Sequence, residues 1–141
     1  MNPLQNDRQA MPENVRVAAL QMVSTPCVDE NLATAERLIA DAVAQGAGLV
    51  ALPEYFPIMG MSDSDKVALR EVDGNGPIQA FLADAARRHG VWLVAGSLPL
   101  VASDPGKVLN SCLVYDPTGQ RVARYDKIHL FGFQKGAECY N

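Results

Sequence analysis

The sequence has few cysteines, few histidines and no long apolar run, and each shortage excludes a class of protein. Three cysteines in 141 residues form no C-x-x-C pair, and an odd count without such spacing argues against a disulfide framework. Two histidines leave a metal cluster with few ligands. No apolar run reaches the roughly 18 residues that a membrane helix needs. We therefore expect no disulfide framework, no metal and no membrane partner.

An excess of basic charge is also missing. The formal net charge is -4 and the sequence pI is about 5.0. Basic residues do not gather into a stripe, so the sequence shows no electrostatic footprint for nucleic acid. The first 14 residues are polar and lack the apolar core of a secretion signal, which predicts a flexible leader and a cytoplasmic protein.

The remainder, residues 15–141, has the composition of one globular domain. Apolar residues make up 48% and charged residues 20% of the chain, which is ordinary globular usage. Short apolar, β-branched runs predict five strands, at 15–22, 49–52, 91–96, 108–115 and 121–125. The last two strands flank a turn at 116–119 and form an expected hairpin.

Two amphipathic stretches predict helices between the first three strands. The first has Asp29 as its expected N-cap and ends before Gly46, and the second runs from Pro77 to Gly90. Residues 54–61 read as a loop, and 62–72 as either a short helix or a mobile turn. Strands that alternate with long helices predict a layered α/β fold.

Glu54 is the first candidate site residue. It directly follows the strand at 49–52, and the carboxyl ends of strands are where open α/β sheets bind ligands. Burying a carboxylate without a partner is costly. The residues alone leave two interpretations open, a functional carboxylate and a surface loop glutamate.

Lys127 is the second candidate, and it follows the strand at 121–125. In an extended chain, side chains two residues apart share a face, so Lys127 and His129 are expected to point together. An exposed lysine and a hydrogen-bonded structural histidine are the alternatives. If Glu54 and Lys127 meet in one pocket, the pair supplies a general base and a cation for an oxyanion.

Three segments in this order resemble the nitrilase superfamily of carbon–nitrogen hydrolases. They are the strand VRVAALQM, the motif LVALPEYF and the motif RYDKIHLF, and the likeness extends from Val15 to Asn141. The resemblance implies an α-β-β-α sandwich, of which this chain holds the N-terminal half. It also implies a carbon–nitrogen hydrolase domain over 15–141 that is incomplete at its C-terminal end.

The family uses a Glu–Lys–Cys triad to cleave non-peptide carbon–nitrogen bonds in amides, carbamoyl compounds or nitriles. By resemblance, Glu54 matches the general base and Lys127 the lysine. Glu138 matches a second glutamate that positions substrate in many members, or is a surface glutamate. Tyr55 either lines the substrate pocket or covers the end of the sheet. The resemblance implies a small-molecule substrate, no cofactor and a homo-oligomeric full-length form, and it does not choose among the substrates.

The family's cysteine lies a few tens of residues past the lysine, beyond Asn141. Cys112 is expected to pack in the core, and neither Cys27 nor Cys139 has the sequence context of the family nucleophile. We therefore expect the chain to be inactive by itself. The alternative is a non-catalytic interaction module that associates through an exposed sheet or with a complementary half.

Overall fold

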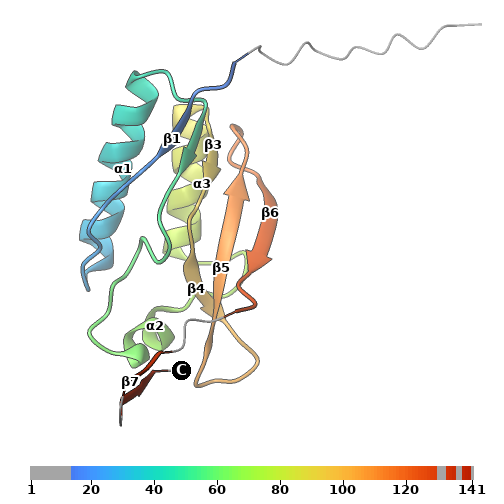
Figure 1. Ribbon diagram of the computed structural model, residues 1–141. Helices are drawn as coiled ribbons and strands as arrows, with labels where there is room; N and C mark the ends of the chain where they lie inside the picture. Colours follow the sequence, from blue (N-terminus) through green and yellow to red (C-terminus); the bar gives the residue numbers. More distant parts are fainter. Residues whose placement is uncertain (1–13, 130–132, 136–137, 141) are drawn as a thin grey trace, which may run out of the picture.

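One mixed sheet, covered on one face by two long helices, makes up most of the molecule (Figure 1). The computed structural model describes residues 14–129, 133–135 and 138–140. The strands of the sheet are β1 (Val17–Ala19), β2 (Leu49–Ala51), β3 (Trp92–Val94), β4 (Leu98–Val101), β5 (Val108–Tyr115) and β6 (Arg121–Asp126). The helices are α1 (Val28–Ala44), α2 (Asp63–Leu69) and α3 (Pro77–His89), and β7 (Phe133–Lys135) and β8 (Glu138–Tyr140) form a separate hairpin.

The strand directions bring two strand ends to the same end of the sheet. β1, β2 and β3 are parallel to one another, β5 runs antiparallel to β3, and β6 runs antiparallel to β5. β6 is therefore parallel to β2. The carboxyl ends of β2 and β6, where Glu54 and Lys127 follow, lie at one end of the sheet.

The core lies between the sheet and the two long helices. Val50, Leu93 and Leu113 point from the central strands to this side, and each is fully buried together with Ile39 of α1 and Leu82 of α3. Alternate residues of a strand point to opposite faces, so each of these strands also presents residues to the other side.

That other face is apolar and open. Val17, Trp92 and Tyr125 are 60%, 43% and 57% exposed, and none of the described helices lies over this face of the sheet (Figure 1). One helical layer on one sheet is half of a four-layer arrangement, which confirms the predicted layered α/β class.

Several boundaries differ from the expectations. The N-cap of α1 is Cys27, not Asp29. The Cys27 side chain makes no capping hydrogen bond, and the Cys27 carbonyl accepts a hydrogen bond from the amide of Asn31 at 3.2 Å. Asp29 instead lies in the first turn, where a negative charge favours the helix dipole. The segment 62–72 contains the helix α2, with a capping box at Ser62 and Asp65.

Three strands, β4, β7 and β8, were missed by the sequence analysis. β4 contains Pro99, which has no amide to donate and therefore weakens a strand pattern. The β7–β8 hairpin is formed by short segments whose apolar residues do not alternate with polar ones.

Candidate active site

The side chains of Glu54 and Lys127 meet at the end of the sheet that the strand directions define. Lys127 Nζ lies 2.8 Å from Glu54 Oε1 and donates a hydrogen bond to it. The two residues are 73 positions apart in the sequence. The contact that the motifs led us to expect is present, while the catalytic roles of both residues stay a prediction.

The chain turns sharply as it leaves β2, and this turn carries Glu54. The amide of Leu52 donates to the carbonyl of Val94 at 2.9 Å, and the amide of Tyr55 donates to Ser97 Oγ at 2.9 Å. Tyr55 has a positive φ of 50°, which a non-glycine residue adopts rarely and at an energetic cost. Glu54 thus sits between two fixed backbone points.

Gly96 allows this turn to approach the sheet. Its φ is +56°, and a Cβ at this position would collide with the main-chain oxygen of Pro53 and stand 2.5 Å from that of Leu52. Only a residue without a side chain fits here, so Gly96 lets the backbone next to Glu54 lie against the β3–β4 junction.

Lys127 is placed by the last backbone pair of the β5–β6 ladder. Its amide donates to the carbonyl of Asn110 at 2.9 Å, one step beyond the Ser111–Asp126 pair. The side chain of Asn110 also reaches the site, because its Nδ2 donates to Glu54 Oε1 at 2.7 Å.

Glu54 is held in its charged form. The hydrogen bond from Lys127 lowers the pKa of Glu54 below its ordinary value, burial opposes that shift, and the hydrogen bond from Asn110 and the charges of Lys127 and Lys66 add to the lowering. The side chain of Glu54 is 55% exposed and that of Lys127 is 32% exposed, so solvent screens the pair. At neutral pH the site therefore presents a carboxylate and a cation in contact.

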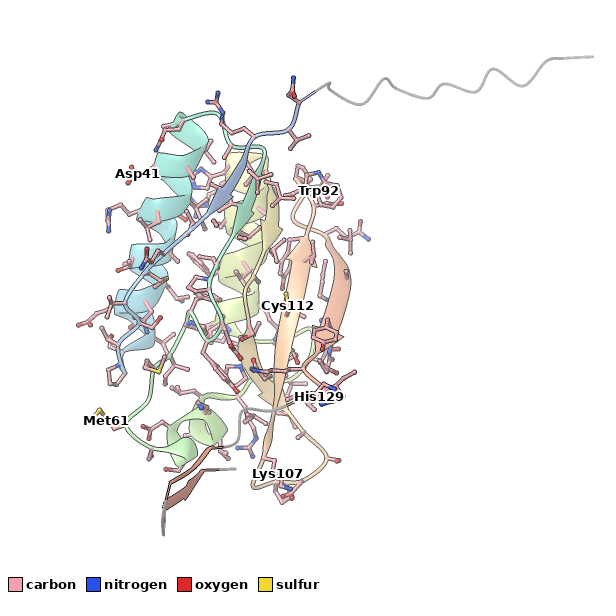
Figure 2. The ribbon with its side chains drawn as sticks, viewed as in Figure 1. Asp41, Met61, Trp92, Lys107, Cys112 and His129 are labelled. Atoms are coloured by element: carbon pink, nitrogen blue, oxygen red, sulfur yellow. The ribbon has the colours of Figure 1, made fainter. Side chains whose placement is uncertain are left out.

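A cavity of about 350 Å³ surrounds this pair. It is lined by Glu54, Gly96, Ser97, Asn110, Cys112, Tyr125, Lys127 and His129. Lys127 and His129 line the same cavity, which agrees with their expected shared face. Cys112 and His129 are labelled in Figure 2, on β5 and beyond the end of β6.

Cys112 differs from its expected place in the core. It is half-buried and lines the cavity on the open face of the sheet, because alternation along β5 directs Leu113 and Ser111 to the helices instead. Burial raises the pKa of the Cys112 thiol, which keeps it in the less nucleophilic protonated form.

Of the other two predicted site residues, Tyr55 is fully described and is not among the residues that line the cavity, whereas Glu138 is described only in its backbone. Tyr55 is half-buried, and Lys66 Nζ lies over its ring, 4.5 Å from the ring centroid. The backbone of Glu138 lies in β8, and its side chain is outside the described residues. Their roles in substrate binding stay predictions.

Sequence analysis missed the part that Asn110 and Ser97 take in the site. Both are buried polar residues, Asn110 within β5 and Ser97 between β3 and β4. The signal was present, because Asn110 and Ser111 interrupt an otherwise apolar strand, and a buried polar side chain requires a partner. The pattern does not say which partner it has.

Comparison with known proteins identifies the class. The sequence model of the carbon-nitrogen hydrolase family matches residues 16–139. The chain belongs to this family, which makes it a relative of amidases within the nitrilase superfamily.

Two curated relatives illustrate the likeness. A deaminated glutathione amidase from Synechocystis sp. is 44% identical over 115 residues, which cover 81% of this chain and 42% of that protein. The omega-amidase NIT2 of Xenopus tropicalis is 34% identical over 116 residues, which cover 82% of this chain and 41% of that protein. The chain thus spans about two fifths of the length of these relatives.

Solved structures show the same fold. The NitFhit protein of C. elegans superposes with a TM-score of 0.75 at 28% identity, over 88% of this chain and 30% of that one. An amidase from Nesterenkonia sp. gives a TM-score of 0.69 at 29% identity, over 84% of this chain and 44% of that one.

Two other features are absent from the residues that the structure describes. There, no three His, Cys, Asp or Glu side chains gather as a metal site. No helix in that part of the chain is both long and apolar enough to cross a membrane.

Proposed function

We propose that this chain supplies the base and the cation of an active site that hydrolyses small amides, with Glu54 as general base and Lys127 as the group that stabilises the oxyanion. One observation carries the proposal. A carboxylate and an ammonium group from distant segments lie 2.8 Å apart in a cavity at the carboxyl ends of their strands.

The proposed chemistry uses a cysteine nucleophile, as the family resemblance implies. The Glu54 carboxylate takes the thiol proton, and the thiolate attacks the amide carbon. As Glu54 becomes neutral its attraction for Lys127 weakens, and the ammonium group is then available for the tetrahedral anion. Glu54 returns the proton to the departing nitrogen, ammonia or an amine leaves, and a water that Glu54 deprotonates releases the acid.

The names of the relatives favour an amide over a nitrile or carbamoyl substrate. Both curated relatives described above are called amidases. We propose that Tyr55 and Glu138 contact the part of the substrate that is not cleaved.

We also propose that these 141 residues alone do not turn over substrate. Cys112 is the described cysteine that lines the cavity with Glu54, and its raised thiol pKa opposes attack. The purified chain is incubated with simple amides and N-carbamoyl amino acids. If the chain turns over substrate and replacing one of its cysteines by serine abolishes that turnover, this part of the proposal is wrong.

A chimera tests the main proposal. Residues 15–141 replace the matching segment of the Synechocystis amidase, and hydrolysis of that enzyme's amide substrate is measured. We expect activity that Glu54→Gln and Lys127→Met each abolish, while the exposed control Asp41→Asn (Figure 2) retains it. A folded chimera that is inactive, or one that tolerates Glu54→Gln, refutes the proposal.

The open face of the sheet favours a second candidate function, an interaction module. Val17 and Trp92 are exposed on a face that no described helix covers, and Trp92 is labelled in Figure 2. Exposed apolar patches of this kind mark association surfaces. Sedimentation velocity then shows concentration-dependent association, which Trp92→Lys weakens and Asp41→Asn does not. A monomer at every concentration excludes this candidate.

A further inference from the structure

Asn110 contacts both members of the Glu54–Lys127 pair from the middle of the sheet. It lies in β5 and is 5% exposed. Its Nδ2 donates to Glu54 Oε1 at 2.7 Å, and its main-chain carbonyl accepts the amide of Lys127 at 2.9 Å. One residue therefore connects two segments that are far apart in the sequence.

The chemistry of the carboxylate fixes the orientation of the Asn110 amide. An ionised carboxylate has no proton to donate, so the NH₂ end of Asn110 faces Glu54 and the oxygen Oδ1 points away. Oδ1 is buried, and no donor from the described residues reaches it.

A buried acceptor without a donor destabilises a fold. A leucine of similar size would occupy the same position in β5 without that cost. Stability of the sheet therefore does not explain an asparagine at this position, whereas its contact with Glu54 does.

Both donors of the site reach the same oxygen. Lys127 Nζ and Asn110 Nδ2 each donate to Glu54 Oε1. A proton that arrives on Oε1 would displace one of them, while a proton on Oε2 leaves both bonds in place.

We propose that Asn110 is a positioning residue that turns Oε1 of Glu54 toward Lys127 and thereby presents Oε2 as the oxygen that takes the proton. The inference rests on the proposed function of Glu54 as a base. The hydrogen bond of Asn110 is also one of the causes that lower the pKa of Glu54, after the hydrogen bond of Lys127.

The test compares Asn110→Leu with the control Ser111→Ala in the 141-residue chain. Ser111 is the next residue of β5, fully buried on the other face, and its hydroxyl donates to Asp126 Oδ1 at 2.6 Å. The Glu54 carboxyl carbon is titrated by ¹³C NMR, and the unfolding midpoint is measured in urea.

Asn110→Leu is expected to raise the pKa of Glu54 and to leave the unfolding midpoint unchanged or higher. Ser111→Ala is expected to lower the midpoint and leave the pKa of Glu54 where it was. Should leucine not fit, Asn110→Ala removes the same donor. An unmoved pKa of Glu54 in the asparagine variants overturns the inference and leaves Asn110 as a merely structural residue.

The chimera separates this inference from the proposed function. If the chimera hydrolyses amides, Asn110→Leu moves the acid limb of kcat/KM to higher pH, because a base must be deprotonated and the pKa of Glu54 has risen. We also expect a loss in kcat that exceeds the change in KM. A folded but inactive chimera refutes the proposed function. A pKa of Glu54 that stays unchanged when Asn110 is replaced refutes only the positioning role.

Discussion

Replacing Gly96 by alanine tests the backbone packing that places Glu54. Gly96 has a φ of +56°, and a Cβ there meets the main-chain oxygens of Pro53 and Leu52. Gly90 is a matched control, because its φ is +64° and a Cβ there meets nothing within 4 Å. Both substitutions impose the left-handed conformation on alanine, and only Gly96→Ala adds a collision with backbone.

The expected losses in unfolding free energy follow from the left-handed conformation and from the collision. The left-handed conformation costs alanine about 1–2 kcal/mol, which is the full expected loss for Gly90→Ala. An inserted methyl group in a packed site adds about 1–3 kcal/mol, so Gly96→Ala is expected to lose about 2–5 kcal/mol in total. The collision is with backbone, which shifts less readily than a side chain.

Urea unfolding of both variants measures this difference, and ¹³C NMR of the Glu54 carboxyl reports whether the site has moved. We expect Gly96→Ala to be the less stable variant and to shift the Glu54 signal, while Gly90→Ala leaves the signal unchanged. Equal losses in the two variants would refute the claim that the Pro53–Gly96 approach positions Glu54.

Three further predictions concern other parts of the chain. Glu71 is 7% exposed and accepts the first two free backbone amides of α3, so Glu71→Ala is expected to cost about 1–3 kcal/mol in urea unfolding; a loss under about 0.5 kcal/mol would contradict this. In a variant with Cys139 replaced by serine, the exposed Cys27 is expected to react with maleimide faster than Cys112, because burial raises the pKa of the Cys112 thiol. The reverse order of reaction would count against the burial of Cys112. The hydrogen bond from Arg88 lowers the pKa of Glu36. The ionised Glu36 therefore stabilises the fold above the unfolded-state pKa, and this stabilisation is lost as pH falls through the folded-state pKa. Wild type should lose more stability than Glu36→Gln between pH 7 and pH 3, and equal losses would show that the Glu36–Arg88 pair contributes nothing.

The sequence patterns located the main elements because each is long or strongly periodic. The stripe of apolar residues in α1 and the breaker before Pro77 defined the two long helices. β4 was not predicted because Pro99 lacks a backbone donor, and the position of β4 in the sheet is decided by its pairing with β5. Pairing of this kind depends on segments distant in the sequence, which a local pattern does not contain.

The site shows the same division between local and distant information. The motifs singled out Glu54 and Lys127, and the parallel directions of β2 and β6 explain why they meet. The role of Asn110 required the register of β5 against β6, which sets its carbonyl opposite the amide of Lys127. The exposure of Cys112 was misjudged because a mid-strand position does not say which face of the sheet is covered.

The most direct test of the whole account is a titration of the Glu54 carboxyl group in wild type and in Lys127→Met. The hydrogen bond between the two side chains is the largest cause of the lowered pKa of Glu54. We predict that Glu54 in wild type titrates below its ordinary range and that its pKa rises when methionine replaces the lysine. A Glu54 that titrates at its ordinary pKa in both proteins would show that the two groups do not meet.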